Sequence, residues 1–118
     1  MLSRNMKELR IGNLTVKLPI IQGGMGVGIS LSGLAAAVAN QGGIGVIAAA
    51  GIGMIDMNSS VSYGEANIKA MRREIRTARK LTAGIIGVNI MVALSNFADL
   101  VKTSIEEGAD AIFAGAGL

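Results

Sequence analysis

Pro19-Ile-Ile-Gln-Gly-Gly-Met-Gly-Val-Gly28 is the stretch that decides how this chain folds. It begins as a short apolar strand and continues into a loop with four glycines in six residues. Because glycine has no Cβ, such a loop can bring its backbone N–H groups against a flat or anionic ligand. The alternative interpretation is that these glycines permit a tight turn and close packing of a following helix. A strand end, bare backbone and then a helix form the usual cofactor site of α/β proteins.

Strands and helices are expected to alternate along the rest of the chain. Residues 11–16 predict a small hairpin, because Gly-Asn between strand-forming residues favours a tight turn. We expect strands at about 19–22, 44–48, 86–92 and 111–114, and helices from Ser30 or Ser32 to Gly42, over 65–82 and from Asn96 to Gly108. This pattern predicts a parallel sheet covered by helices, either doubly wound or a (β/α)8 barrel. At 118 residues the chain is about half of the ~250 residues that such a barrel needs.

Apolar residues at helical spacing predict the buried side of each helix. These residues are Leu31, Leu34, Ala35 and Val38 in the first helix, Ile68, Met71, Ile75 and Ala78 in the second, and Phe97, Leu100, Val101 and Ile105 in the third. A serine, Ser30 or Ser32, is expected to cap the first helix. The loop over residues 49–63 is long enough to be a functional lid or a mobile segment.

The absence of histidine and cysteine excludes several kinds of chemistry. A chain without cysteine has neither disulfides nor thiolate nucleophiles. A chain without histidine has no histidine-based triad and no zinc site of the common type, so we predict no metal site. Residues 1–10 are polar and basic with no apolar segment behind them, which favours a cytoplasmic location over secretion.

Basic residues gather between Lys69 and Lys80, a window with a net charge of +5 in a chain whose total is +3. A solvated outer helix face is the simpler interpretation. A nucleic-acid-binding patch is the alternative, but no aromatic residues interleave with these charges, and we predict no nucleic-acid partner.

Residues 18–55 contain no charged side chain, which raises the question of a membrane segment. Polar residues and glycines interrupt this stretch before any apolar run reaches the ~20 residues of a spanning helix. Two buried strands around an alanine-rich helix explain the composition, so we predict no membrane partner.

Polar and glycine positions recur where the predicted strands end, at residues 22–28, 49–53, 89 and 115–117. In a parallel barrel these ends converge on one face, where sites form. The glycine spacing does not match the dinucleotide fingerprint, no acidic residue ends the second strand, and no P-loop motif is present. Asn89 interrupts an apolar strand, either as a hydrogen-bonded core amide or as an amide that contacts the polar edge of a ring-shaped ligand. Met25 is either a packed loop residue or a thioether against a cofactor ring.

Five blocks of sequence, in order, resemble the N-terminal part of the nitronate monooxygenase family. The blocks are Pro19-Ile-Ile-Gln-Gly-Gly-Met25, Leu34-Ala-Ala-Ala-Val-Ala39, Gly42-Gly-Ile-Gly-Val-Ile47, Gly87-Val-Asn-Ile-Met91 and Gly108-Ala-Asp-Ala-Ile-Phe-Ala-Gly-Ala-Gly117. This family, formerly called 2-nitropropane dioxygenase, includes the FMN-dependent enoyl-ACP reductase II enzymes. The resemblance implies a TIM barrel with FMN at its C-terminal face. Residues 1–118 would be the N-terminal half of that barrel, with about four parallel strands, three helices and a short N-terminal hairpin.

The resemblance also implies roles for particular residues. Gly23, Gly24 and Met25 would line the FMN ring, Gln22 would lie beside them, and Asn89 would hydrogen-bond the ring. The family's phosphate-binding loops and its histidine near the substrate come from later in the barrel, so no catalytic residue is expected here. The implied activity is oxidation of a small alkyl nitronate by O2.

Two alternatives accompany this interpretation. One is an NAD(P)H-dependent reductase of the enoyl-ACP type, acting on an enoyl thioester. The other is a catalytically inactive half-barrel, because exposed sheet edges recruit partners. Such a chain would associate with itself or with a missing barrel half.

Overall fold

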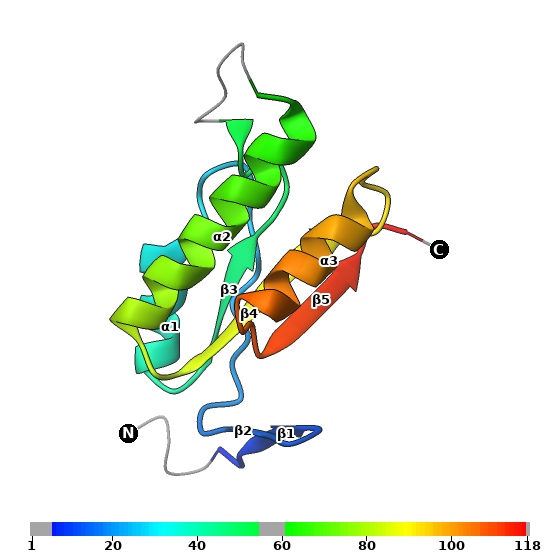
Figure 1. Cartoon of the computed structure of the whole chain (residues 1–118). Coiled ribbons are helices and arrows are strands. Elements are labelled where there is room, and N and C mark those ends of the chain that lie inside the picture. The colour runs from blue at the N-terminus through cyan, green and yellow to red at the C-terminus, as the bar shows by residue number, and fades with distance from the viewer. Residues whose placement is uncertain (1–5, 55–60, 118) are drawn as a thin grey trace.

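The structure is a computed structural model that describes residues 6–54 and 61–117. Three helices and five strands follow one another in these residues (Figure 1). In chain order they are β1 (Leu9–Ile11), β2 (Leu14–Val16), α1 (Ser32–Asn40), β3 (Ile44–Ala48), α2 (Tyr63–Leu81), β4 (Ile85–Met91), α3 (Phe97–Glu106) and β5 (Ala111–Gly115). Residues 55–60, in the middle of the predicted 49–63 loop, lie outside the described residues, and α2 begins at Tyr63, slightly before its predicted start.

A parallel sheet in the order β3-β4-β5 confirms the predicted α/β class. Its register pairs Ala48 with Asn89, and Asn89 with Phe113, so the carboxyl ends of the three strands lie together. The prediction of about four regular parallel strands is wrong for residues 19–22. That segment forms a single parallel bridge, Ile21 to Ile44, beside β3. Beyond this bridge, the next N–H of β3 in register, that of Val46, donates to the side-chain Oε1 of Gln22 and not to a backbone carbonyl.

The predicted hairpin is present and covers the amino-terminal end of the sheet (Figure 1). β1 and β2 pair antiparallel around Gly12, whose φ of +56° suits glycine in a tight turn. Val16 at the end of β2 is fully buried and packs with Ile44 and Val46 of β3. The hairpin therefore closes the end of the sheet opposite to the carboxyl ends of the strands.

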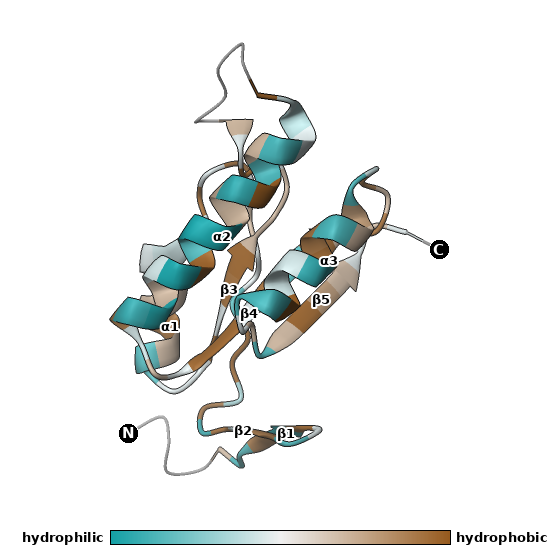
Figure 2. Cartoon of the chain, in the orientation of Figure 1, coloured by the Kyte–Doolittle hydropathy of each residue, from teal (hydrophilic) through white to brown (hydrophobic). Residues whose placement is uncertain are grey.

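Two apolar clusters lie on opposite faces of the sheet. The larger lies under the helices, where Ile47, Val88 and Ile90 pack with Met71 and Leu100. The smaller includes Val16, Ile44 and Val46, with Ile85 and Phe113 packed against it. Figure 2 shows the apolar strands behind helices whose outer surfaces are mainly hydrophilic. Every residue of β3 is buried, so this strand is covered on both faces, as its continuous apolar sequence predicts.

The predicted buried face of α1 is partly wrong. Ala35, Ala36 and Ala39 are buried, whereas Leu34 is 46% exposed. The reason is the distance between helix and sheet, since a Cβ on Gly45 of β3 would overlap the backbone of Ala35. Only small side chains fit between elements that approach so closely. The larger apolar residues of α1 are therefore turned away from the sheet.

The predicted serine cap of α1 is also wrong. Leu31 occupies the N-cap position and makes no side-chain cap. Instead the backbone N–H of Ser32 donates to Oε1 of Glu74, a residue of α2, at 3.1 Å. A carboxylate near a helix amino terminus is favourable because it complements the unpaired N–H groups there. Long-range packing thus supplies the cap that local sequence was expected to supply.

The prediction that α3 buries Ile105 is wrong, because this residue is 65% exposed. The residues that α3 buries fully are Leu100, Thr103 and Ser104. Both hydroxyls donate to backbone carbonyls one turn earlier, Thr103 to Asp99 and Ser104 to Leu100, so they can be buried without an unpaired polar group. The inward face of α3 is therefore less apolar than the sequence spacing indicates.

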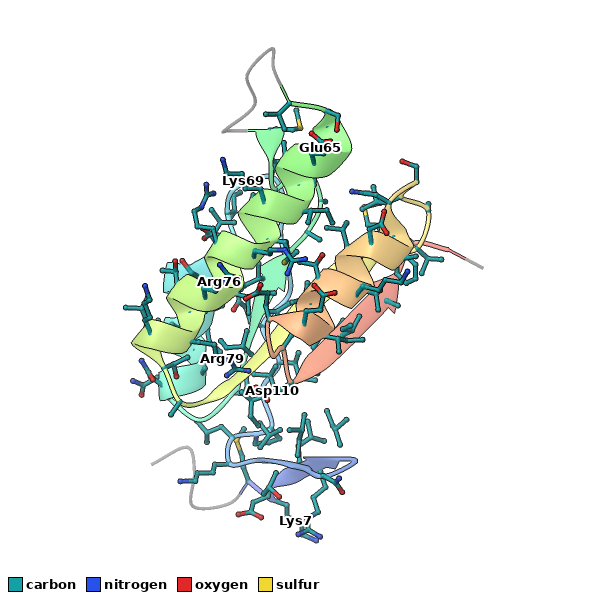
Figure 3. All side chains as sticks on the ribbon, viewed as in Figure 1. Lys7, Glu65, Lys69, Arg76, Arg79 and Asp110 are labelled. Carbon is teal, nitrogen blue, oxygen red and sulfur yellow. The ribbon has the colours of Figure 1, made fainter. Side chains whose placement is uncertain are left out.

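α2 follows its predicted periodicity, with Met71, Ile75 and Ala78 buried and Ile68 partly buried. Its basic face is not simply solvated. Arg72 pairs with Glu106 and Glu107, and Arg76 pairs with Glu107. Figure 3 shows Arg79 of α2 close to Asp110, which precedes β5. These ion pairs connect α2 to the end of α3 and account for three of the basic residues that the nucleic-acid alternative would use.

Glu107 makes the stability of the fold depend on pH. Arg76 and Arg72 donate hydrogen bonds to its carboxylate and lower its pKa. A carboxyl group whose pKa is lower in the folded chain stabilises the fold above its unfolded pKa of about 4.3. This stabilisation is lost as the pH falls through the lower, folded value.

We therefore expect Glu107→Gln to lower the urea midpoint near neutral pH, and the difference from the unsubstituted chain to shrink below about pH 4. Urea titrations of the variant and of the unsubstituted chain, from near-neutral pH to below about pH 4, measure the difference between their midpoints. A difference that stays the same in acid would contradict the assigned ion pairs.

Within residues 6–54 and 61–117, no helix is both long enough and apolar enough to cross a membrane.

Candidate functional site at the carboxyl ends of the strands

The four strand-end segments singled out in the sequence meet at one end of the sheet. Backbone hydrogen bonds connect them in order. The Ala48 N–H donates to the Ser30 carbonyl, the Ala49 N–H to the Asn89 carbonyl, and the Val92 N–H to the Gly115 carbonyl. The structure therefore brings the glycine loop, the end of β3 and the end of β4 together, as the parallel topology predicts.

Gly24 and Asn89 lie in direct apposition. A Cβ built on Gly24 would lie 2.8 Å from Cβ of Asn89 and 3.3 Å from Cγ1 of Val46. Gly24 is thus required by the close approach of the loop to β3 and β4. At Gly23 a Cβ would meet nothing within 4 Å, so its bare backbone faces open space. Gly24 therefore fits the interpretation that glycine permits close packing, whereas Gly23 fits the interpretation that glycine leaves backbone open to a ligand.

The amide of Asn89 has unused hydrogen-bonding capacity. Asn89 is half-buried on the face of β4 that lies opposite the helices. Among the described residues no hydrogen bond of its side chain is found, so the interpretation as a satisfied core amide is not supported. A side-chain amide has two donors and an acceptor. This amide is placed at a strand end, next to bare backbone, with its polar atoms available.

Gln22 differs from Asn89 because both the oxygen and the nitrogen of its amide are hydrogen-bonded within the protein. Its Oε1 accepts from the backbone N–H of Val46 at 2.9 Å, and its Nε2 donates to Oγ of Ser30 at 3.1 Å. The Gln22 side chain thereby makes the hydrogen bond to the Val46 N–H of β3 that a backbone carbonyl would make in a continuing parallel strand. Gln22 connects the loop to β3 next to Gly23.

Ser30 is a residue of this site that the sequence did not reveal. It is 1% exposed, and its Oγ accepts from the Met25 N–H at 2.9 Å. The sequence suggested only a helix cap, and a buried serine between a glycine loop and a helix gives no stronger signal. Its role depends on contacts with Gln22 and Met25 that arise only once the loop has folded.

The glycine loop also rests on the segment that follows β3. A Cβ on Gly26 would lie 2.9 Å from the carbonyl oxygen of Ala50, and a Cβ on Gly51 would lie 2.8 Å from Val27. Gly51 has a φ of +62°, which L side chains rarely adopt. Met25 itself is 59% exposed, so packing against the described residues does not account for its thioether. The described residues contain no group of three side chains suited to bind a metal ion.

Comparison with known proteins identifies the family. A family model described as nitronate monooxygenase matches residues 7–115. The chain belongs to this family. The match includes the first four sequence blocks that carry the predicted resemblance and residues 108–115 of the fifth, and it confirms that resemblance. A search of curated proteins found no match.

Two solved structures of FabK from Thermotoga maritima are similar to this member of the nitronate monooxygenase family. The first is 34% identical with a TM-score of 0.63, and the alignment covers 84% of this chain and 27% of that chain. The second, a single-substitution mutant, is 35% identical with a TM-score of 0.64, and the alignment covers 84% and 29%. The chain therefore spans less than a third of either structure.

Proposed function

We propose that these residues form the part of an FMN site that contacts the flavin ring, in an oxidoreductase of the nitronate monooxygenase family. The observation that carries the proposal is the amide of Asn89, which makes no hydrogen bond to residues 6–54 or 61–117, beside the bare backbone of Gly23 and Gly24. A flat ligand with a polar edge needs close backbone on its face and an amide at its edge. The strand ends of this sheet supply both features.

Each predicted site residue has a role in this arrangement. The backbone of Gly23 and Gly24 and the exposed thioether of Met25 would lie against the ring, and Asn89 would hydrogen-bond its edge. Gln22, whose amide is held by Val46 and Ser30, would support the loop beside the ring. When bound, FMN supplies the electron transfer, whereas the residues of this chain orient it and cover one side.

The reaction we propose for the complete enzyme is oxidation of an alkyl nitronate by O2 to a carbonyl compound and nitrite. An NAD(P)H-dependent reduction of an enoyl thioester is the alternative, because the family includes enzymes of both kinds. Nitronate-dependent O2 uptake and NADH oxidation with an enoyl thioester distinguish the two. The half-barrel assignment of residues 1–118 is part of the same proposal, supported by the similarity to FabK over 84% of the chain.

An FMN titration of the purified chain, followed by quenching of flavin fluorescence, tests the cofactor assignment. We expect saturable quenching, because the residues that we propose to contact the ring, Gly24 and Asn89 among them, already lie together without a ligand. Flavin fluorescence that does not change over the titration would contradict an FMN site in these residues.

A second candidate function is association between copies of this chain. An apolar groove of about 280 Å³ lies along the 19–22 segment, lined by Leu18, Ile20, Ala37, Val38, Gln41 and Gly43. In the described residues β5 pairs only with β4 and the 19–22 segment only with β3, so the sheet has two open parallel edges. We infer that a second copy covers both edges, since two such units together approach the eight strands of a barrel. Light scattering should give twice the 12.0 kDa of one chain, and a monomer would contradict this inference.

A further inference from the structure

Every polar group of Ser30 is hydrogen-bonded, either to residues 22–25 or to β3. Its Oγ accepts from the Met25 N–H at 2.9 Å and from Nε2 of Gln22 at 3.1 Å, and it donates to the Gly23 carbonyl at 3.5 Å. A serine hydroxyl has one donor and two acceptor positions, so this hydroxyl is saturated. Its own N–H donates to the Met25 carbonyl, and its carbonyl accepts from the Ala48 N–H, both at 2.9 Å.

These bonds determine the shape of the glycine loop. Glycine-rich backbone has many accessible conformations, so four glycines in six residues do not by themselves specify one. Residues 23–25 are held at both of their polar ends by Ser30, through the Gly23 carbonyl and the Met25 N–H. Ser30 is in turn anchored to β3 directly at Ala48 and, through Gln22, at Val46. The buried hydroxyl of Ser30 therefore adds side-chain bonds at Gly23 and Met25 to the attachment that the Ser30 backbone and Gln22 already make to the sheet.

We propose that Ser30 is a positioning residue that sets the conformation of residues 23–25 and thereby presents their backbone to a flat ligand. Ser30 is 1% exposed and does not itself contact a ligand in this account. Its effect passes through Met25 and Gly23. The claim about loop conformation stands on the hydrogen bonds alone, whereas its consequence for ligand binding rests on the proposed function.

Ser30→Ala tests the claim, with Ser104→Ala as its matched control. Ser104 is 0% exposed, and its Oγ donates to the Leu100 carbonyl inside α3, remote from the loop. The first measurement is hydrogen exchange at the Met25 amide by NMR. We expect protection of this amide in the unsubstituted chain, exchange at least about tenfold faster in Ser30→Ala, and no change in Ser104→Ala. The second measurement is riboflavin affinity, because riboflavin carries the ring without the phosphate.

Riboflavin should bind Ser30→Ala at least about tenfold more weakly, and Ser104→Ala as tightly as the unsubstituted chain. A purely general loss of stability would affect both variants, so the contrast isolates positioning. A Met25 amide that exchanges as fast in the unsubstituted chain as an exposed amide overturns the proposal, and this test needs no variant to fold. Unchanged exchange in Ser30→Ala overturns it as well.

The outcomes also separate this inference from the proposed function. If the unsubstituted chain binds no riboflavin but Ser30→Ala accelerates exchange at Met25, the conformational role of Ser30 stands and the flavin assignment fails. If exchange accelerates in Ser30→Ala while riboflavin affinity stays unchanged, the loop conformation does not control the ligand and that part of the proposal is overturned.

Discussion

Gly45→Ala is expected to lower the free energy of unfolding by about 1–3 kcal/mol or more, because overpacking forces the surrounding backbone to shift. Gly45 lies in the middle of β3, where a Cβ would overlap backbone atoms of Ala35 in α1. No flexible side-chain end is available to move away. The helix must retreat from the sheet, which would also separate Ala35 and Ala39 from the larger apolar cluster. Urea denaturation followed by circular dichroism measures the effect.

Gly33→Ala is the matched control, since it makes the same change within α1. A Cβ on Gly33 would meet nothing within 4 Å, and this residue is exposed. Alanine favours a helix over glycine by roughly 0.5–1 kcal/mol, so this variant should be as stable as the unsubstituted chain or more stable. If both variants unfold at the same urea concentration, the close contact between α1 and β3 is wrong.

Asn89→Ala is expected to weaken FMN binding by roughly 1–2 kcal/mol, about five- to thirtyfold, because it removes a hydrogen bond to the ring. The same change should leave the fold intact. The amide of Asn89 makes no hydrogen bond within the described residues, so its removal leaves no protein group unpaired. A loss of affinity without a loss of stability would therefore mark Asn89 as a ligand-binding residue. Flavin quenching and thermal denaturation on the same samples provide both numbers.

Asn40→Ala serves as the control for Asn89→Ala. Asn40 ends α1, and its Nδ2 donates to the Leu81 carbonyl, at the end of α2 that lies away from the strand ends. Its replacement should leave FMN affinity unchanged. Equal affinities in the Asn89 variant and the unsubstituted chain would remove Asn89 from the site.

The sequence predicted those elements whose burial follows a simple period. α2 buries Met71, Ile75 and Ala78 as its spacing indicates, and β3 is covered on both faces as its unbroken apolar sequence indicates. Periodicity failed in part for α1, where the close approach to β3 decided which side chains fit, and for α3, which buries Thr103 and Ser104 with their hydroxyls bonded to its own backbone. Gly45 allows α1 to approach so closely that alanines replace leucine at the contact. No pattern within α1 itself carries that information.

The candidate site was predictable in its outline but not in its internal connections. Strand ends, glycines and the isolated Asn89 are visible in the sequence, and their convergence follows from parallel topology. The pairing of Gln22 with Val46, and of Ser30 with Met25, depends on side chains meeting across folded segments. The cap that Glu74 provides to α1 could not be predicted either, because Ser32 and Glu74 are 42 positions apart in the sequence and meet only in the folded chain.

A ¹⁵N NMR titration of the labelled chain with FMN tests directly whether the flavin binds at these strand ends. We expect the side-chain amide of Asn89 and the backbone amides of Gly23 and Gly24 to shift together and saturate at one concentration. Residues of the hairpin at the opposite end of the sheet, such as Leu9 and Val16, should not shift. Saturable shifts that avoid Asn89 and the glycine loop, or no shifts at all, would contradict an FMN site at these strand ends.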